Sequence, residues 1–204
     1  MARVIHRHNL VMQRVNAAYI NSSNKDSILV MALGLHGING QAAWDVADIL
    51  DFLRELATMK YFDSFDPVDK LLVTPAYISG NMGNLVRSMI TFIHQALVQI
   101  DQHLYTVDSI TEALCRHPEL TTLLCEAFKN KFDPWNNNFD AYLRIRKRFI
   151  NDVNRIDTGH AENDTRRKNV LFMGMAFIHN TLKTNFYRMN FTALSFRLDP
   201  KYLD

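Results

Sequence analysis

The segment from Arg166 to about Tyr187 constrains the fold more than any other part of this sequence. When it is drawn as a helix, apolar residues lie on nearly every side of it: Val170, Leu171, Met173, Met175, Phe177, Ile178 and Leu182. A helix that is apolar all round has to be buried against neighbours on all sides. The segment therefore predicts the central member of a helical bundle.

Shorter amphipathic segments precede it and supply the surrounding helices. Apolar residues recur at three- and four-residue spacing in 84–105, in a short segment through Cys115, in the segment that Pro118 opens, and in 139–156. Thr106 and Asp108 are good capping residues, and Pro118 suits a first helical turn, where its missing N–H costs nothing. The fold class that we expect is mainly α, a bundle of about five helices.

The first 66 residues predict a small α/β portion. Two short apolar runs, 10–20 and 27–35, flank the turn-forming sequence NSSNKD, which favours a hairpin or a neighbouring strand pair. After GLHGING, apolar residues between Trp44 and Ala57 follow a helical period. Two strands and a helix are about half of a small ferredoxin-like sandwich.

The end of the chain switches to strict alternation, in which Leu194, Phe196 and Leu198 point one way and Ser195 and Arg197 the other. That period is typical of a half-buried strand. The sequence offers no evident partner, so we expect an orphan strand. The predicted domains are 1–66 (α/β), 67–190 (helical bundle) and 191–204 (the strand).

Composition narrows the class of protein. The chain is 48% apolar and 22% charged with a net charge of +2, which is an ordinary globular composition and gives no sign of nucleic-acid binding. Cys115 and Cys125 show no ligand spacing and are expected to be small buried hydrophobes in a reducing compartment. No signal peptide or membrane span is visible. We expect a cytoplasmic protein. The mitochondrial matrix is the alternative, because residues 1–25 carry four basic side chains and no acidic one.

The glycines of GLHGING fall at Gly34, Gly37 and Gly40, a spacing that fits neither GxGxxG nor the P-loop. A tight turn into the following helix is the preferred interpretation. Weak amino-acid binding at this strand–helix turn remains an alternative.

Histidines and basic residues are the other candidates for chemistry. The eight histidines are His6, His8, His36, His94, His103, His117, His160 and His179. His6 and His8 would share one face of a strand, but nothing nearby completes a metal site. His117 is expected to help start a helix, and His179 to be a core imidazole bonded to a neighbour.

The sequence from Arg144 to Lys168 contains four acidic residues and eight basic ones. The basic residues are Arg144, Arg146, Lys147, Arg148, Arg155, Arg166, Arg167 and Lys168. Without interleaved aromatic side chains, we expect a solvated face or an inter-domain contact rather than nucleic-acid binding. No acid/base pair or GxSxG is evident. We therefore predict no catalytic, cofactor-binding or metal-binding residue in this chain.

Several stretches resemble, in the same order, the region upstream of the catalytic domain in the large NAD-dependent glutamate dehydrogenases. The specific ones are LKTNFYRMNFTALSFRLDPKYLD and CRHPELTTLLCEAFKNKFDP; the others are DSILVMALGLHG, AWDVADI, GNMGNLVRSMITFIHQAL and IDTGHAENDTRRKNVLF. Together they cover most of the chain from Asn24 onward.

The resemblance implies a non-catalytic segment of such an enzyme, with ACT-like modules and helices associated with oligomerisation and regulation. It implies NAD as the cofactor of the parent but none in this segment. The implied partners are the rest of the enzyme chain and further copies, without nucleic acid or membrane. The alternative is a self-contained amino-acid-sensing or protein-interaction module.

Overall fold

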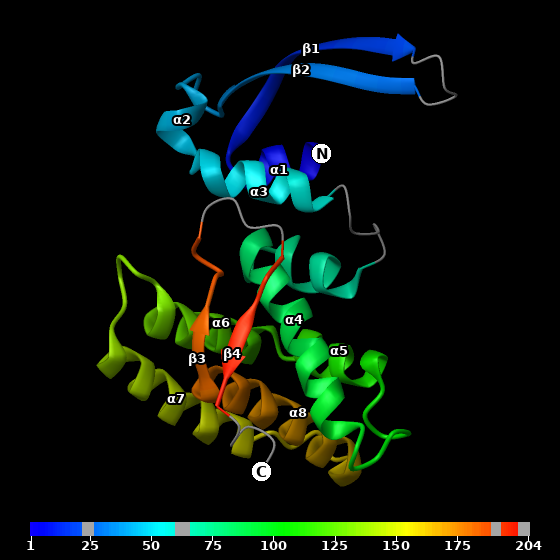
Figure 1. The fold of residues 1–204 in the computed structure, drawn as a ribbon, viewed down its shortest axis with the longest axis vertical. Helices are drawn as coiled ribbons and strands as arrows, with labels where there is room; N and C mark the ends of the chain where they lie inside the picture. The colour runs from blue at the N-terminus through cyan, green and yellow to red at the C-terminus, as the bar shows by residue number, and fades with distance from the viewer. Residues whose placement is uncertain (22–26, 60–65, 189–192, 200–204) are drawn as a thin grey trace. The chain divides into compact units, whose positions relative to one another are not determined.

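The computed structural model describes residues 1–21, 27–59, 66–188 and 193–199, and the chain divides into two compact units, Met1–Ser64 and Phe65–Asp204. The predicted mainly helical structure and the N-terminal strand pair are confirmed, and the chain also has a small C-terminal sheet (Figure 1). Within the described residues, no helix combines the length and apolarity needed to cross a bilayer.

The first unit is built on a long antiparallel hairpin. It consists of α1 (Ala2–Arg7), β1 (Leu10–Asn21), β2 (Ser27–Gly37), α2 (Ala43–Val46) and α3 (Ile49–Met59). The predicted strand pair is confirmed, and the register places Leu10 opposite Gly37 and Ile20 opposite Ile28. The predicted helix is divided between α2 and α3. At the start of α3, the Asp48 carboxylate accepts hydrogen bonds from the main-chain N–H groups of Leu50 and Asp51.

The expectation that His6 and His8 share a strand face is wrong, because residues 2–7 form α1. Side chains two residues apart on a helix do not lie on the same face, so His6 and His8 point in different directions. His6 is exposed, whereas His8 Nε2 lies 2.8 Å from the Glu55 carboxylate of α3. Arg7 pairs with the same carboxylate, so Glu55 joins α1 to α3.

The second unit is a helical bundle with a two-stranded sheet. Its elements are η1 (Asp69–Val73, one π-helical turn), α4 (Gly80–Leu97), α5 (Val107–Arg116), α6 (Pro118–Phe132), α7 (Phe139–Asn154), α8 (Ala161–Asn180), β3 (Thr181–Thr184) and β4 (Phe196–Leu198). Side chains of Ser79, Thr106 and Asn138 cap α4, α5 and α7. The predicted roles of Thr106 and Pro118 are confirmed.

Helix α8 contacts α4, α5, α6 and α7, which confirms its predicted central position. Val170, Leu171, Phe177 and Ile178 have no exposed surface. Gly174 allows α8 to lie close to α6, since a Cβ at this position would be 3.1 Å from the Leu124 side chain of α6.

Two predicted helices end earlier than expected. Helix α4 stops at Leu97 rather than near Tyr105, because the Asp101 carboxylate accepts hydrogen bonds from the N–H groups of His103 and Leu104 and closes a turn. These bonds also lower the pKa of Asp101. Helix α8 stops at Asn180 rather than near Tyr187.

The side chain of Lys131, which belongs to α6, caps the C-terminal end of α8. Its Nζ donates to the carbonyl oxygens of Ile178, His179 and Thr181 at 2.8, 2.7 and 2.9 Å. Burial lowers its pKa to about 8, so the ammonium remains charged at pH 7 and its hydrogen bonds are charge-assisted. These carbonyls would otherwise lack partners at the helix end.

The orphan strand that we expected is wrong, because β4 pairs with β3. The Asn185 side chain links the two ends of the connection between β3 and β4: its Nδ2 donates to the Ala193 carbonyl oxygen, and its Oδ1 accepts from the Ser195 N–H. The predicted facing is confirmed: Leu194, Phe196 and Leu198 pack against the bundle core. Phe196 lies 5.0 Å from Phe177, ring centre to ring centre. The sequence did not indicate β3 as the partner of β4, because β3 lies where the apolar residues continue a helical pattern.

Lys131→Met should lower the free energy of unfolding by about 1–3 kcal/mol, because three carbonyls lose a charged donor while the apolar stem is retained. Urea denaturation at pH 7 measures this change. Lys129→Met is the control, since Lys129 is exposed on the same last turn of α6. Equal midpoints for the two variants would contradict the assigned role of Lys131.

Candidate functional site

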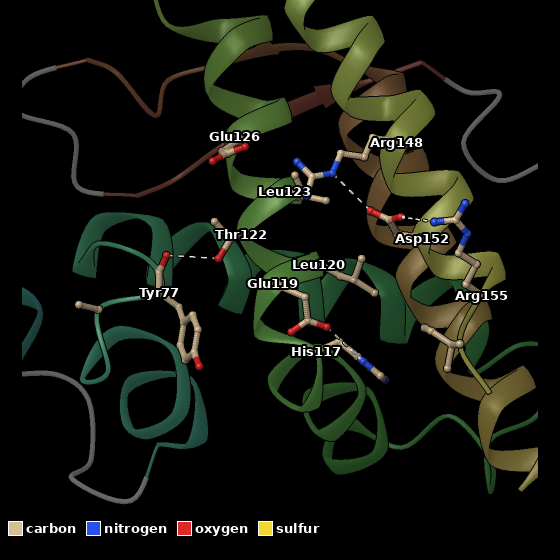
Figure 2. Close-up of a pocket in the computed structure, with 12 residues that line it drawn as sticks. Tyr77, His117, Glu119, Leu120, Thr122, Leu123, Glu126, Arg148, Asp152 and Arg155 are labelled. Carbon is tan, nitrogen blue, oxygen red and sulfur yellow. Dashed lines mark hydrogen bonds and ion pairs between the residues drawn. The ribbon is translucent and has the colours of Figure 1, made fainter. Parts of the chain in front are cut away.

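A hollow in the second unit brings together several residues singled out in the sequence, among them His117, Arg148 and Arg155. It has a volume of about 570 Å³ and lies among α6, α7 and the turn at Ala76 and Tyr77 (Figure 2). Its polar or charged lining residues are Tyr77, His117, Glu119, Thr122, Glu126, Arg148, Asp152 and Arg155, and its apolar ones are Ala76, Leu120, Leu123 and Ile156.

Two arginines, one in α7 and one at its C-terminal cap, share one carboxylate at this hollow. Arg148 Nε lies 3.4 Å from one Asp152 oxygen, and Arg155 Nη1 lies 3.7 Å from the other (Figure 2). Both guanidinium groups are largely exposed, at 71% and 80% of their side-chain surface. Such exposed pairs contribute little to stability, so the arginines can change partner at low cost.

The α6 side of the hollow carries the opposite charge. Glu119 and Glu126 are exposed there, and Glu119 lies 3.6 Å from His117 Nδ1. The Thr122 hydroxyl donates to the main-chain carbonyls of Pro118 and Tyr77. The hollow therefore presents charges of both signs over an apolar floor, a combination that suits a polar polypeptide segment better than a small anion.

His117 forms the junction between α5 and α6, as expected, through its main chain. Its carbonyl oxygen accepts hydrogen bonds from the N–H groups of Leu120 and Thr121. Its side chain makes no capping bond. The position of Pro118 predicted a helix start at this residue, but nothing in the sequence indicated that His117 lines the same hollow as Arg148 and Asp152.

The basic stretch does not form one cationic face. Arg144, Arg148 and Arg155 are exposed, as predicted. Arg167, however, is buried and lies 2.9 Å from Glu112 of α5, and Arg166 lies 3.4 Å from the same residue. The pattern of basic residues did not reveal these inward pairs, because Glu112 lies more than fifty residues earlier in the sequence.

Asp164 extends the Glu112 ion pairs at the start of α8. Its carboxylate accepts hydrogen bonds from the Thr158 hydroxyl at 2.6 Å and the Thr158 N–H at 2.7 Å, and lies 3.6 Å from Arg167. The hydrogen bonds from Thr158 lower the pKa of Asp164, with a smaller effect of Arg167.

A second hollow of about 520 Å³ lies between η1, α4 and α5 and includes Asp66, Arg87, Glu112 and Cys115. Asp66 and Arg87 form an ion pair across it. Burial, reinforced by the nearby charges of Asp66 and Glu112, raises the pKa of Cys115 to about 11. Burial also raises the pKa of Cys125, to about 12. Both thiols stay protonated at neutral pH and are poor nucleophiles.

The space beside Gly37 in the glycine turn is filled by protein atoms, whereas that beside Gly40 is open. A Cβ on Gly37 would lie 2.6 Å from Val46 Cγ2 and 2.9 Å from the Gln41 side-chain oxygen. The Gly37 N–H donates to the Gln41 carbonyl, and that of Gly40 to the Gly37 carbonyl. Gly40 adopts a positive φ of 80°, as a tight turn requires. These residues do not fit the pyrophosphate of a nicotinamide dinucleotide, which needs free N–H groups and open space.

The remaining histidines stand apart from both hollows. His179 is exposed rather than a core residue, although Nδ1 lies 3.0 Å from the Tyr142 hydroxyl, so the expected bond to a neighbour is present. His36 Nδ1 lies 2.7 Å from the Gly37 carbonyl oxygen. His94 is half-buried, and His103 and His160 are exposed. Among the described residues, no three potential ligands cluster in a way that could hold a metal ion.

Comparison with known proteins gives one distant match. The chain is 29% identical over 116 residues to glutamate dehydrogenase 2 of Dictyostelium discoideum. The matched part is 55% of this chain and 11% of that enzyme, so the chain spans about a tenth of its relative. No protein-family model matches the chain, and no solved structure does. The chain thus has a distant, partial similarity to a large glutamate dehydrogenase.

Asp164→Asn should lower the urea midpoint at pH 7, because an amide cannot accept both Thr158 bonds and carries no charge toward Arg167. The lowered folded-state pKa means that Asp164 stabilises the fold above its ordinary value of 3.8 and that this contribution is lost as the pH falls below it. The difference from wild type should therefore disappear in acid. Asp140→Asn, exposed in the first turn of α7, is the control; an equal effect at Asp140 would refute the assignment.

Cys115 and Cys125 should react with a thiol reagent such as DTNB only when the protein unfolds, because both are buried and protonated. The reaction is followed at pH 8 in buffer and in 6 M guanidinium chloride. Rapid stoichiometric labelling of either thiol in buffer would contradict the pKa shifts.

Proposed function

We propose that this chain is a non-catalytic scaffold or regulatory segment of a large NAD-dependent glutamate dehydrogenase. The parent enzyme would convert glutamate and NAD to 2-oxoglutarate, ammonium and NADH. The single observation that carries the proposal is the partial match to glutamate dehydrogenase 2, which involves about a tenth of that enzyme.

The packing of the second unit supports a scaffold role. Its helices share one apolar core that extends from Val68 to Phe186, and α8 lies at the centre of that core. The charged groups of its hollows are engaged with one another, as at Arg148 and Asp152 or Asp66 and Arg87. This arrangement suits a rigid body that positions other parts of a chain.

The open hollow between α6 and α7 is the surface of this unit that we assign to contact with the rest of the enzyme. Its exposed arginines and glutamates can pair with charges on a second surface without breaking the core below them. Leu120 and Ile156 give the contact an apolar floor.

The purified chain should produce no NADH from glutamate and NAD, measured as absorbance at 340 nm, and NAD should give no heat in calorimetry. A complete glutamate dehydrogenase assayed in parallel is the positive control. Turnover by the 204-residue chain would contradict the non-catalytic assignment.

The coding sequence downstream of Asp204 tests the parent assignment separately. A glycine- and lysine-rich substrate segment followed by GxGxxG would support the proposal. A downstream sequence of another class would refute the glutamate dehydrogenase assignment and leave the scaffold role to be tested alone.

The amino-acid-sensing alternative has no comparable support. It assigned the ligand to the turn at Gly37, where Val46 and Gln41 occupy the space that a ligand would need. We therefore retain one proposed function.

A further inference from the structure

One arginine of the second unit is half-buried without an acceptor for its hydrogen bonds. Arg146 lies on α7, its Nε is buried, and no described residue bonds its guanidinium or forms an ion pair with it. The buried Arg167, in contrast, lies 2.9 Å from Glu112 and 3.6 Å from Asp164. A desolvated charged donor without an acceptor is costly, so Arg146 points to a partner that is not among the described residues.

Two further side chains place polar atoms beside Arg146. Tyr142 lies one turn earlier on the same face of α7, and its hydroxyl lies 3.0 Å from Nδ1 of His179 near the end of α8. Burial lowers the pKa of His179, and the charge of Arg146 lowers it further. The same charge opposes the rise that burial causes in the pKa of Tyr142. Arg146, Tyr142 and His179 therefore form one group of neighbours, which we call the Arg146 cluster.

Lys131 of α6 adds a second positive charge next to the Arg146 cluster. Its Nζ lies 5.7 Å from the centre of the Tyr142 ring, and its charge also lowers the pKa of His179. The three carbonyls at the end of α8 use the three donors of this ammonium. Lys131 therefore contributes charge to the cluster but no free donor, whereas the donors of Arg146 have no acceptor among the described residues.

No carboxylate of a described residue contributes to the pKa shifts of Lys131, Tyr142 or His179. The cluster thus differs from the two hollows, where Arg148 and Arg87 pair with aspartates. It has two fixed positive charges and gains a third when His179 is protonated. Such a group matches an anion of about two negative charges, which a terminal phosphate carries near neutral pH, better than it matches a single carboxylate.

We propose that Arg146, Tyr142 and His179 bind a terminal phosphate group. A guanidinium donates two parallel hydrogen bonds to phosphate oxygens, and the hydroxyl and the imidazole supply donors from two other directions. His179 is exposed and Arg146 is only half-buried, so a small anion can approach from solvent. Each phosphate of the NAD pyrophosphate carries a single charge, so this site does not conflict with the absence of NAD binding. The inference rests on side chains of α6, α7 and α8 and does not depend on the glutamate dehydrogenase assignment.

The contact between Tyr142 and His179 couples phosphate binding to the protonation of His179. A neutral imidazole can accept the hydroxyl hydrogen at Nδ1, which removes this donor from the ligand. An imidazolium instead donates from Nδ1 to the hydroxyl oxygen, and the hydroxyl hydrogen becomes available to a phosphate oxygen. The other charged groups that face His179 are Lys131 of α6 and Arg146 of α7, and both favour the neutral ring until an anion binds. A bound dianion should therefore raise the pKa of His179.

Calorimetry of the full chain with inorganic phosphate tests the site, at pH 7 and constant ionic strength. Arg146→Gln should weaken binding about tenfold or more, because it removes the charge and the paired donors. Arg144→Gln is the matched control, since Arg144 is exposed on the same helix, and it should change the affinity less than about threefold. Urea denaturation verifies that both variants fold. Acetate should bind at least about tenfold more weakly than phosphate.

The pKa of His179 gives a second test that needs no change at Arg146. Histidine ring protons of the wild-type chain are followed by NMR over a pH series, with and without sulfate, a dianion whose charge is constant over the range. Sulfate should raise the pKa of His179, whereas His160, exposed just before α8, should keep its value at matched ionic strength. His179→Gln identifies the resonance.

Glycerol 3-phosphate distinguishes the two sources of a terminal phosphate. Equal affinities for this ester and for inorganic phosphate would support a site for the free ion, and tighter binding of the ester would support a site for a phosphorylated molecule. The proposal is overturned if phosphate gives no binding at millimolar concentration, if acetate binds as tightly, or if Arg144→Gln weakens binding as much as Arg146→Gln. An unchanged pKa of His179 in sulfate would overturn it equally.

Discussion

Burial of α8 is the constraint on which the second unit depends. The helix contacts α4, α5, α6 and α7, and its residues from Val170 to Ile178 are buried or half-buried, whereas Glu162, Asn169 and His179 are exposed. The last carbonyls of a helix find no partner within it and need hydrogen bonds from elsewhere. Lys131 provides those bonds from α6, and Thr181 adds another by donating to the Phe177 carbonyl. Because α8 ends there, the chain can turn into β3 and receive β4.

The two units bury their apolar side chains to different extents. The second unit joins its helices through a continuous core, to which polar contacts such as the bonds of Asp164 to Thr158 and the pairing of Arg167 with Glu112 are added. The first unit has a small core at the base of the hairpin and a long apolar extension.

This division of labour agrees with the proposed place of the chain in a large dehydrogenase. The closed bundle would hold a fixed shape, and its α6–α7 hollow would meet the rest of the enzyme. The core and the hollow are different parts of the unit, so the loss of the contact need not disturb the packing. The distant similarity to glutamate dehydrogenase 2 concerns about a tenth of that enzyme.

Local patterns in the sequence determined most of the elements: the hairpin from two apolar runs on either side of a turn-forming sequence, the helices from their period, and the helix starts at Thr106 and Pro118. They also determined which side of β4 faces the core, because alternation fixes facing without a partner. Tertiary structure alone decided where α8 ends, that β4 has a partner, and which charges meet at the hollow. The physical reason is distance along the chain: Lys131 acts on carbonyls about fifty residues away, and Glu112 reaches Arg167 across a similar interval. Residue periodicity carries no information about contacts of that range.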